Sequence, residues 1–335
     1  MARSRTISNP YYSGPVTDHF DGIRFFTPGQ RIRLLRKREL LKWRLNRRKN
    51  PWPREAPAAV DRPPRCVEGG ALRVSYIGHA SVLVQTQELN LLFDPVWSER
   101  ASPFRFAGPK RVNAPGIAME DLPPLDAIFV SHNHYDHMDV ATLQALRARH
   151  PAARIITGLG NDVILHRRDA AVRAEAHDWG TILPLSDDVR VHLAPSYHWS
   201  ARWFNDRRMA LWAAFVIETP AGAIYYIGDT AYHDGALFRE IGARFGDLRL
   251  AILPIGAYEP RVLMRDLHVN PAEAVRIFQD CGARFALAHH WGTFPLTDEA
   301  IDTPPRDLQR ALAAAGLAKE LFQVRRPGGV FDVPE

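Results

Sequence analysis

Cysteine, long apolar runs and a secretory leader are scarce or missing in this sequence. The 335 residues include two cysteines, Cys66 and Cys281, without CxxC spacing, which excludes a disulfide framework and a zinc site built on thiolates. The longest apolar run, residues 209–217, is about half of what a bilayer-spanning helix needs. The first residues contain no apolar segment typical of a signal peptide. We therefore expect a cytoplasmic chain without a transmembrane helix, in which both cysteines serve packing alone.

Basic charge is concentrated in one segment. The chain carries +6 overall, but residues 31–50 contain ten Lys and Arg against one Glu, so the remainder carries −3. Leu34, Leu41 and Leu45 recur within the segment at roughly helical spacing, which predicts a basic amphipathic helix at 31–49. We expect it to contact an anionic membrane peripherally, on the inner face. Nucleic acid is a weaker candidate partner, and a solvated helix packed on the main domain by its leucines is the alternative.

The sequence divides into two parts. Five prolines follow the basic segment within residues 51–64, a density that neither a helix nor a sheet accommodates, so we expect a linker at about 50–68. Short β-rich runs separated by turns and helices begin at residue 72. We therefore assign residues 1–68 to a basic arm with a proline-rich linker, and residues 69–335 to the main domain.

The main domain has the pattern of an α/β fold. Helices are predicted from Asp139 to residue 149 and from the Asn270 cap to Gly282. Hairpin-like strands early in the domain and strand–helix alternation later favour two sheets face to face with helices outside. The ten predicted strands are 73–77, 81–86, 91–93, 127–130, 154–156, 190–193, 211–218, 223–227, 250–253 and 284–288.

The strongest local signal is a histidine-rich motif directly after the apolar run 127–130. It reads Ser-His-Asn-His-Tyr-Asp-His. His132 and His134 are two residues apart and can point the same way from an extended segment, while Asp136 and His137 follow as the chain turns. This arrangement can supply two adjacent metal positions. Imidazole and carboxylate ligands suit Zn²⁺, with Fe and Mn as alternatives.

Three further ligand-type residues follow apolar runs in the same way. His198 follows the run at 191–194, Asp229 the run at 223–227, and His290 the run at 285–288. We expect these side chains to meet the histidine motif at one edge of the paired sheets. His289 competes with His290 for the last position, and spacing alone does not decide between them.

The ordered set resembles the metallo-β-lactamase-fold hydrolases, and the branch typified by N-acyl-phosphatidylethanolamine-hydrolysing phospholipase D in particular. The resemblance runs from about residue 70 to 325. Around His198 the sequence Tyr-His-Trp-Ser-Ala-Arg departs from the His-Trp-Cys-Lys-Arg of animal members. The motifs that carry the resemblance are Gly-His-Ala-Ser at 78–81, Phe-Asp-Pro at 93–95, Arg-Ala-Ser-Pro at 100–103, Gly-Pro-Lys-Arg at 108–111, the histidine motif at 131–137, Pro-Ile-Gly-Ala-Tyr-Glu-Pro-Arg at 254–261, His-Val-Asn-Pro-Ala-Glu-Ala-Val-Arg at 268–276 and His-Trp-Gly-Thr-Phe at 290–294.

This resemblance implies a four-layer αβ/βα sandwich with two zinc ions per chain, and a homodimer. The residues implied for one metal are His132, His134 and His198; those for the other are Asp136, His137 and His290; Asp229 bridges the two. A hydroxide held between the metals would be the nucleophile, which suits a phosphodiester and equally a lactone or amide carbonyl. The resemblance favours His290 over His289.

Five further residues have two interpretations each. Asp94 either accepts the free ring N–H of a metal-bound histidine or caps a turn. His268 either faces the site, as a proton donor to the leaving group or a phosphate contact, or is a buried structural histidine. Tyr135 either touches substrate or wedges the metal loop against the core. His79 is a lesser candidate for supporting a ligand, and Asp139 is expected to be a helix N-cap rather than a ligand.

These observations lead to one function and two alternatives. The leading hypothesis is a phospholipase D-type phosphodiesterase that releases phosphatidic acid and an N-acylethanolamine, with Asp136, Asp229, Asp94 and His268 in the catalytic machinery. The first alternative is a soluble hydrolase of the ascorbate-6-phosphate lactonase type. The second is a non-catalytic, metal-stabilised module that binds membranes or nucleic acid.

Overall fold

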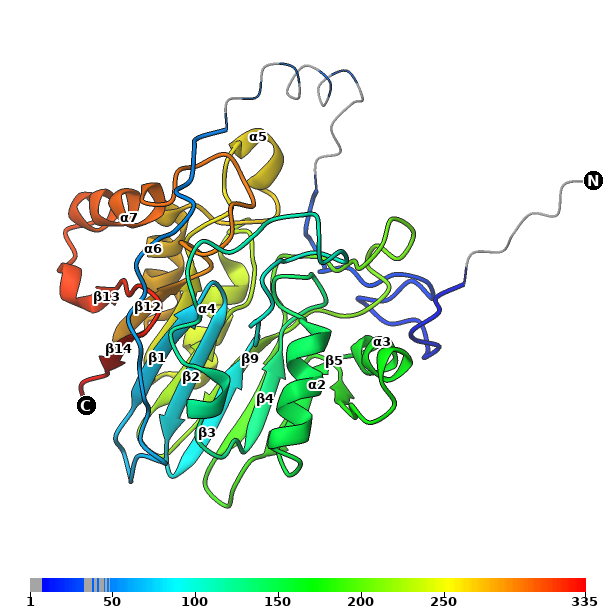
Figure 1. The fold of residues 1–335 in the computed structure, drawn as a ribbon, viewed down its shortest axis with the longest axis horizontal. Coiled ribbons are helices and arrows are strands. Elements are labelled where there is room, and N and C mark those ends of the chain that lie inside the picture. Colours follow the sequence, from blue (N-terminus) through cyan, green and yellow to red (C-terminus); the bar gives the residue numbers. More distant parts are fainter. Residues whose placement is uncertain (1–7, 33–37, 39–40, 42–44, 46, 48) are drawn as a thin grey trace, which may run out of the picture.

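The computed structural model describes residues 8–32, 38, 41, 45, 47 and 49–335. Two sheets pack face to face, with α2 and α3 outside one sheet and α6 and α7 outside the other (Figure 1). This is the four-layer α/β arrangement that the sequence predicts. The basic helix expected at 31–49 falls mostly outside the described residues and stays a prediction. None of the helices in the described ranges is long and apolar enough to cross a lipid bilayer.

The two sheets have the same pairing pattern. Each has seven strands, in the orders β14-β1-β2-β3-β4-β5-β6 and β13-β12-β11-β10-β9-β8-β7. Read from β14 in the first sheet and from β7 in the second, three antiparallel pairs are followed by three parallel pairs. The first sheet contains β1 (Arg73–Gly78), β2 (Ser81–Thr86), β3 (Leu89–Phe93), β4 (Ala127–Val130), β5 (Arg154–Gly158), β6 (Glu175–His177) and β14 (Gly329–Asp332). The second contains β7 (Ile182–Pro184), β8 (Arg190–Ala194), β9 (Ala214–Glu218), β10 (Ala223–Tyr226), β11 (Leu248–Pro254), β12 (Phe285–His289) and β13 (Phe322–Gln323).

Each of the ten predicted strands has a counterpart in the structure; nine agree within two residues at each end, and one starts three residues later than predicted. The strand expected at 211–218 begins at Ala214, because the backbone before it bonds to the first sheet and its loops instead. Leu211 N donates to Leu159 O, and Ala213 N donates to Ser131 O, each at 2.8 Å. The sequence also misses β6, β7, β13 and β14, which are the outer strands of the two sheets. Such edge strands are short and half exposed, so they lack the apolar runs that mark buried strands.

The main core lies between the two sheets. Phe93 and Phe129 stack on the first sheet with ring centroids 4.7 Å apart, and Phe129 contacts Phe215 of the second sheet at 5.0 Å. All three rings are fully buried. A second core fills the space between the first sheet and α2 and α3, around Leu92 and Leu146. Inner strands such as β2, β3, β4 and β11 are buried along their whole length, because they are covered on both faces.

Helix ends follow the local sequence signals. Asp139 caps α2 as predicted, accepting a hydrogen bond from Thr142 N. Asn270 and Glu273 form a capping box at the start of α6, which ends before Gly282 in the left-handed conformation at φ 67°. The helices are α2 (Val140–Arg149), α3 (Asn161–Arg168), α4 (Ala236–Phe245), α5 (Arg261–Met264), α6 (Pro271–Cys281) and α7 (Thr303–Ala314), with 3-10 turns η1 (Met119–Asp121) and η2 (Lys319–Leu321).

The described residues before the first sheet pack against the main domain. Phe20 and Phe25 are buried against Trp212, and Thr27 Oγ1 donates to Ser196 O at 2.8 Å. The proline-rich segment 50–68 follows the surface, where Ala59 N donates to Pro327 O at 2.8 Å. The segment expected to link two parts is therefore itself held to the domain by backbone hydrogen bonds.

The two cysteines are free and differ in environment. Cys281 is buried in the core between the sheets and α6, as expected. Cys66 is exposed in the proline-rich segment. The expectation that both cysteines serve packing is therefore wrong for Cys66, because this side chain lies at the surface.

Candidate metal centre

The histidine-rich motif forms a tight loop between β4 and α2. His137 N and Met138 N both donate to His134 O, at 3.1 and 2.8 Å, which folds the loop back on itself. Asp139 closes the loop by capping α2 and also accepts from Ser98 N at 2.9 Å. The backbone geometry therefore presents the motif's histidines and Asp136 toward the ends of strands in the second sheet.

The first cluster of ligand-type side chains contains His132, His134, His198 and Asp229. The two motif nitrogens, His132 Nε2 and His134 Nδ1, lie 2.8 Å apart, and His198 Nε2 lies 3.3 Å from the same His134 atom. The ring of His198 is oriented by its other nitrogen, Nδ1, which lies 3.0 Å from Leu267 O. One nitrogen or oxygen from each side chain lies within 4.8 Å of the others, close enough to share one ion.

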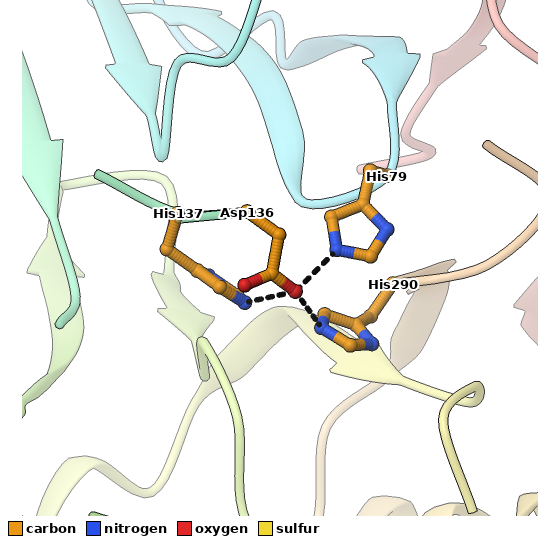
Figure 2. A group of neighbouring side chains, drawn as sticks. All are labelled: His79, Asp136, His137 and His290. Atoms are coloured by element: carbon orange, nitrogen blue, oxygen red, sulfur yellow. Dashed lines mark hydrogen bonds and ion pairs between the residues drawn. The ribbon is translucent and has the colours of Figure 1, made fainter. Parts of the chain in front are cut away.

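The second cluster contains His79, Asp136, His137 and His290 (Figure 2). Oxygen Oδ2 of Asp136 is at its centre, 3.0 Å from His79 Nε2, 3.3 Å from His290 Nε2 and 3.8 Å from His137 Nε2. The sequence treats His79 as a lesser candidate, whereas the structure places its ring against both Asp136 and His290. His79 follows β1 at φ 56°, a left-handed conformation that turns its ring toward the loop.

Asp229 lies between the two clusters. Its Oδ2 is 3.8 Å from His132 Nε2 and 3.2 Å from His137 Nε2, while its Oδ1 is 3.1 Å from His290 Nε2. The carboxylate therefore faces both sets of imidazoles at once, as a bridging role requires. All seven predicted metal ligands are brought together, and they come from loops after β4, β8, β10 and β12.

Asp94 holds the ring of His137 from the side opposite to Asp229. Its Oδ2 accepts from Tyr226 Oη and Ser131 Oγ at 2.7 and 2.6 Å, and lies 2.7 Å from His137 Nδ1. Asp94 is fully buried. The contact between Asp94 and a ligand-type histidine is the one that the sequence predicts, and Tyr226 and Ser131 are supporting partners that the sequence does not identify.

His290, rather than its neighbour, faces the clusters. His289 Nε2 lies 2.7 Å from Ile227 O, and its ring stacks on Tyr226 at 5.2 Å, so the side chain is used within the second sheet. His268 does reach the centre, where its Nδ1 lies 3.8 Å from Asp229 Oδ2. The side chain of His268 is 11% exposed, so it borders the centre from the solvent side.

Tyr135 points away from the clusters. Its hydroxyl donates to Arg202 O at 3.0 Å, and its ring lies under the Arg202 guanidinium at 3.8 Å. Tyr135 and Asp139 line a cavity of about 580 Å³ on the far side of the metal loop, and no described residue of the two clusters lines that cavity. Tyr135 is therefore positioned to wedge the metal loop against Arg202.

The electrostatics of the centre divide the histidines into two groups. Burial, followed by the neighbouring imidazoles, holds the pKa of His132 well below its usual range, and burial lowers that of His134 to about 4. Burial acts the same way on His137 and His290, but carboxylates led by Asp229 outweigh it, raising the pKa of His290 to about 9 and that of His137 well above its usual range. Neutral imidazoles in the first group offer lone pairs to a cation without losing a proton.

The donor set fits a divalent metal. His137 Nε2, His290 Nε2 and Asp229 Oδ1 are buried and make no hydrogen bond within the described part of the chain. Buried polar atoms are normally satisfied, and a cation between the clusters would give each of these atoms a partner. Imidazole nitrogens and carboxylate oxygens without thiolates are the ligands of catalytic zinc sites, and they also suit Fe and Mn.

The fold and this pair of clusters are those of a known class of enzymes. The beta-lactamase superfamily domain matches residues 89–291, more than half of the chain. The chain belongs to the metallo-β-lactamase superfamily and is a metal-dependent hydrolase.

The chain is similar to several individual proteins and solved structures. The chain is 34% identical over 251 residues to N-acyl-phosphatidylethanolamine-hydrolyzing phospholipase D 1 of Caenorhabditis elegans, which covers 73% of this chain and 70% of that protein. It is 30% identical over 261 residues to a metal-dependent hydrolase of Pyrobaculum neutrophilum, covering 77% of this chain and 99% of that one. Among solved structures, the metallo hydrolase Igni18 of Ignicoccus hospitalis superposes with a TM-score of 0.58 at 19% identity, covering 78% and 97% of the two chains. The last likeness supports the fold alone.

Proposed function

We propose that this protein is a dinuclear-zinc phosphodiesterase of the phospholipase D type. It would hydrolyse N-acyl-phosphatidylethanolamine or a related phospholipid to phosphatidic acid and an N-acylethanolamine. The observation that carries the proposal is the 34% identity to the nematode phospholipase over 251 residues. The two clusters around Asp229 support it, because paired metal positions suit the displacement of a phosphodiester.

The side chains around the clusters have distinct tasks in this proposal. Zinc ions held there would activate a water molecule and neutralise charge on the phosphoryl oxygens. Asp229 faces both clusters and would hold the two ions at a fixed separation, with Asp136 completing the second position. His268, at the solvent side of Asp229, is placed to donate a proton to the leaving alkoxide or to contact the phosphate.

The proposed substrate requires contact with a membrane surface. The basic segment 31–49 would supply it through attraction to anionic lipids. The described Leu41 and Leu45 are 58% and 76% exposed, which supports contact with an interface over packing on the domain. A homodimer belongs to the same proposal by resemblance, and nucleic acid is the weaker candidate partner for the basic segment.

A second candidate function is hydrolysis of a small phosphorylated or lactone substrate, as in the ascorbate-6-phosphate lactonase type. The similarity to the Pyrobaculum metal-dependent hydrolase favours it, because this chain covers 99% of that protein. The clusters do not choose between the two, since polarisation by a metal ion acts on phosphorus and carbon centres alike.

Mass spectrometry of reaction products tests the proposal directly. The zinc-loaded protein would be incubated with vesicles of N-acyl-phosphatidylethanolamine, with His134→Ala as the parallel control. Phosphatidic acid and N-acylethanolamine released by the wild type alone would support the lipid phosphodiesterase. If a protein shown to hold its metals releases neither product, the result would favour small phosphorylated or lactone substrates. Hydrolysis by His134→Ala would contradict the mechanism, and vesicle binding without any turnover would favour the non-catalytic module.

A further inference from the structure

Four aromatic side chains form a continuous exposed row outside the metal centre. The ring of Phe104 lies 5.5 Å from Phe106 and 6.5 Å from Trp203, and Trp203 lies 5.1 Å from Phe204. Phe106 is 82% and Phe204 93% exposed, while Phe104 and Trp203 are about half exposed. We call these four residues the aromatic face. Contiguous exposed apolar groups of this kind mark interaction sites rather than ordinary surface.

The aromatic face is built from two loops that are held in place. In the first loop, Arg100 Nη1 donates to Gly108 O at 2.7 Å. In the second, Asp206 accepts hydrogen bonds from the backbone N–H groups of Arg202 and Trp203, at 3.0 and 2.8 Å. Tyr11 from the N-terminal segment also donates to Asp206, at 3.0 Å. The rings therefore project from loops that are ordered by polar contacts beneath them.

Basic charge surrounds the aromatic face. Residues 99–110 contain three basic residues against one acidic residue. Residues 199–208 contain another three against one, of which Arg202 is turned inward over Tyr135 while Arg207 and Arg208 are partly exposed. The acidic residue of the first loop, Glu99, is paired with Lys110 at 2.6 Å. Arg105, between the two phenylalanines, is exposed. The surface thus combines apolar rings with net positive charge, which is complementary to an anionic lipid leaflet.

The aromatic face adjoins the metal loop. Phe104 and Arg105 line the cavity of about 580 Å³ whose other walls include Tyr135 and Arg202. On the second loop, the ring of Trp199 lies 4.7 Å from that of His134 in the first cluster. In Figure 1 the loops that follow β3 and precede β9 lie at the same end of the sheets as the loop between β4 and α2. A surface that docks on these rings would therefore lie beside the metal centre.

We propose that the aromatic face inserts into the interfacial region of an anionic lipid bilayer and orients the metal centre toward it. This inference deepens the proposed function, on which it rests, by naming a second membrane contact outside residues 31–49. Phenylalanine and tryptophan rings partition into the headgroup boundary, and the flanking arginines are attracted to anionic headgroups. A protein partner or a second copy of this chain would fit the rings but gives no reason for the surrounding positive charge.

Sedimentation with vesicles tests the inference. The full-length protein and the double variant Phe106→Ser/Phe204→Ser would be compared on phosphatidylcholine vesicles with and without phosphatidylglycerol. Both rings are exposed, so these substitutions leave folding unchanged. We expect the affinity for the anionic vesicles to fall about tenfold or more, because two rings that would be buried in the bilayer are lost. The matched control Val16→Ser/Val60→Ser removes two side chains that are each 70% exposed elsewhere, and it should bind like the wild type.

A quenching measurement places one ring of the aromatic face in the bilayer. Vesicles containing brominated acyl chains should quench tryptophan fluorescence in the wild type, and Trp203→Phe should reduce the quenching to what Trp43 of the basic segment contributes. Wild-type affinity in the Phe106→Ser/Phe204→Ser variant, or unchanged quenching in Trp203→Phe, would overturn the inference. So would an oligomer that dissociates in the double variant while vesicle binding persists, since the face would then be a contact between copies.

The same experiments separate the inference from the proposed function. Neither binding nor quenching depends on turnover. A protein that binds vesicles through the aromatic face but releases no phosphatidic acid would contradict the proposed function alone. A protein that releases phosphatidic acid, and whose double variant binds like the wild type, would contradict the inference alone.

Discussion

Asp94 Oδ2 and His137 Nδ1 lie 2.7 Å apart, and both side chains are buried. The contact fixes which nitrogen of His137 faces the clusters, because Nε2 is left 3.2 Å from Asp229. The same Asp94 oxygen accepts from Tyr226, which belongs to the second sheet. One buried carboxylate therefore aligns a ligand-type histidine and ties the two sheets together beneath it.

Removal of this carboxylate should weaken metal binding without abolishing it. In Asp94→Ala the ring of His137 loses its orienting partner, and we expect zinc affinity to fall about 10- to 100-fold. Competition with a chromophoric chelator would measure the affinity. Asp187→Ala, an exposed carboxylate between β7 and β8, is the matched control. Wild-type zinc affinity in Asp94→Ala would show that the orientation of His137 does not depend on this contact.

The two clusters should respond differently to substitution. His134 belongs to the first cluster alone, so His134→Ala should lose one metal position and abolish turnover. Asp229 faces both clusters, so Asp229→Ala should deplete both positions. Elemental analysis of metal per chain would distinguish these outcomes. His166→Ala, an exposed histidine on α3, should keep both metals. Equal stoichiometry in His134→Ala and Asp229→Ala would argue against a bridging carboxylate.

Gly256 should tolerate no side chain. A Cβ built at this position would overlap the backbone carbonyl oxygen of His290, a residue whose backbone N–H donates to His79 O at 2.7 Å. We expect Gly256→Ala to lower the free energy of unfolding by about 1–3 kcal/mol and to displace His290 from the second cluster. Urea denaturation and metal analysis would report the two effects. Gly70→Ala is the control, because its Cβ would meet only the side chain of Ala221, at 3.3 Å.

The capping box of α6 should contribute measurably to stability. Asn270→Ala removes the side-chain acceptor for Glu273 N and should cost about 1 kcal/mol of unfolding free energy. The change is expected as a lower Tm in calorimetry. Asp162→Ala is a matched control, since it lies in the first turn of α3, where no side-chain cap is formed. An unchanged Tm for Asn270→Ala would mean that neighbouring groups replace the cap.

Binding through the basic segment can be tested without disturbing the fold. Deletion of residues 1–50 would weaken binding to anionic vesicles, but it would also remove Phe20 and Phe25 from their packing against Trp212. Neutralising residues 36–38 to glutamine avoids this loss. We expect weaker binding to anionic vesicles and a shallower dependence on salt, because fewer charges are screened. Unchanged co-sedimentation would refute the contribution of this segment.

Much of the site could be predicted because it depends on the ends of buried strands. β4 is apolar throughout and β12 is apolar up to its last residue, so the polar residues at their ends stand out in the sequence. The parallel pairing of β11 and β12 then brings such residues to one edge of a sheet. Spacing alone does not choose between His289 and His290, but the resemblance favours His290. The structure agrees, with His289 Nε2 on Ile227 O and His290 Nε2 beside Asp229.

Other features leave no periodic signal. His79 joins the second cluster only because β1 ends in a left-handed turn, and the Gly-His-Ala-Ser motif around it was the available clue. The packing of Phe20 and Phe25 depends on Trp212, which is far away in the sequence. The aromatic face likewise combines two distant loops whose phenylalanines are indistinguishable, in sequence, from core residues. Contacts of this kind are set by tertiary structure rather than by local pattern.

The outermost strand of the first sheet also determines when the protein can finish folding. β14 pairs along its length with β1, so the start and the end of the main domain meet in one sheet. During synthesis β1 leaves the ribosome long before residues 329–332 exist, because chains are made from the N-terminus. Until then the outer edge of β1 presents unpaired backbone groups to any other extended chain. The nascent protein therefore carries an open, aggregation-prone edge through nearly the whole translation of this domain.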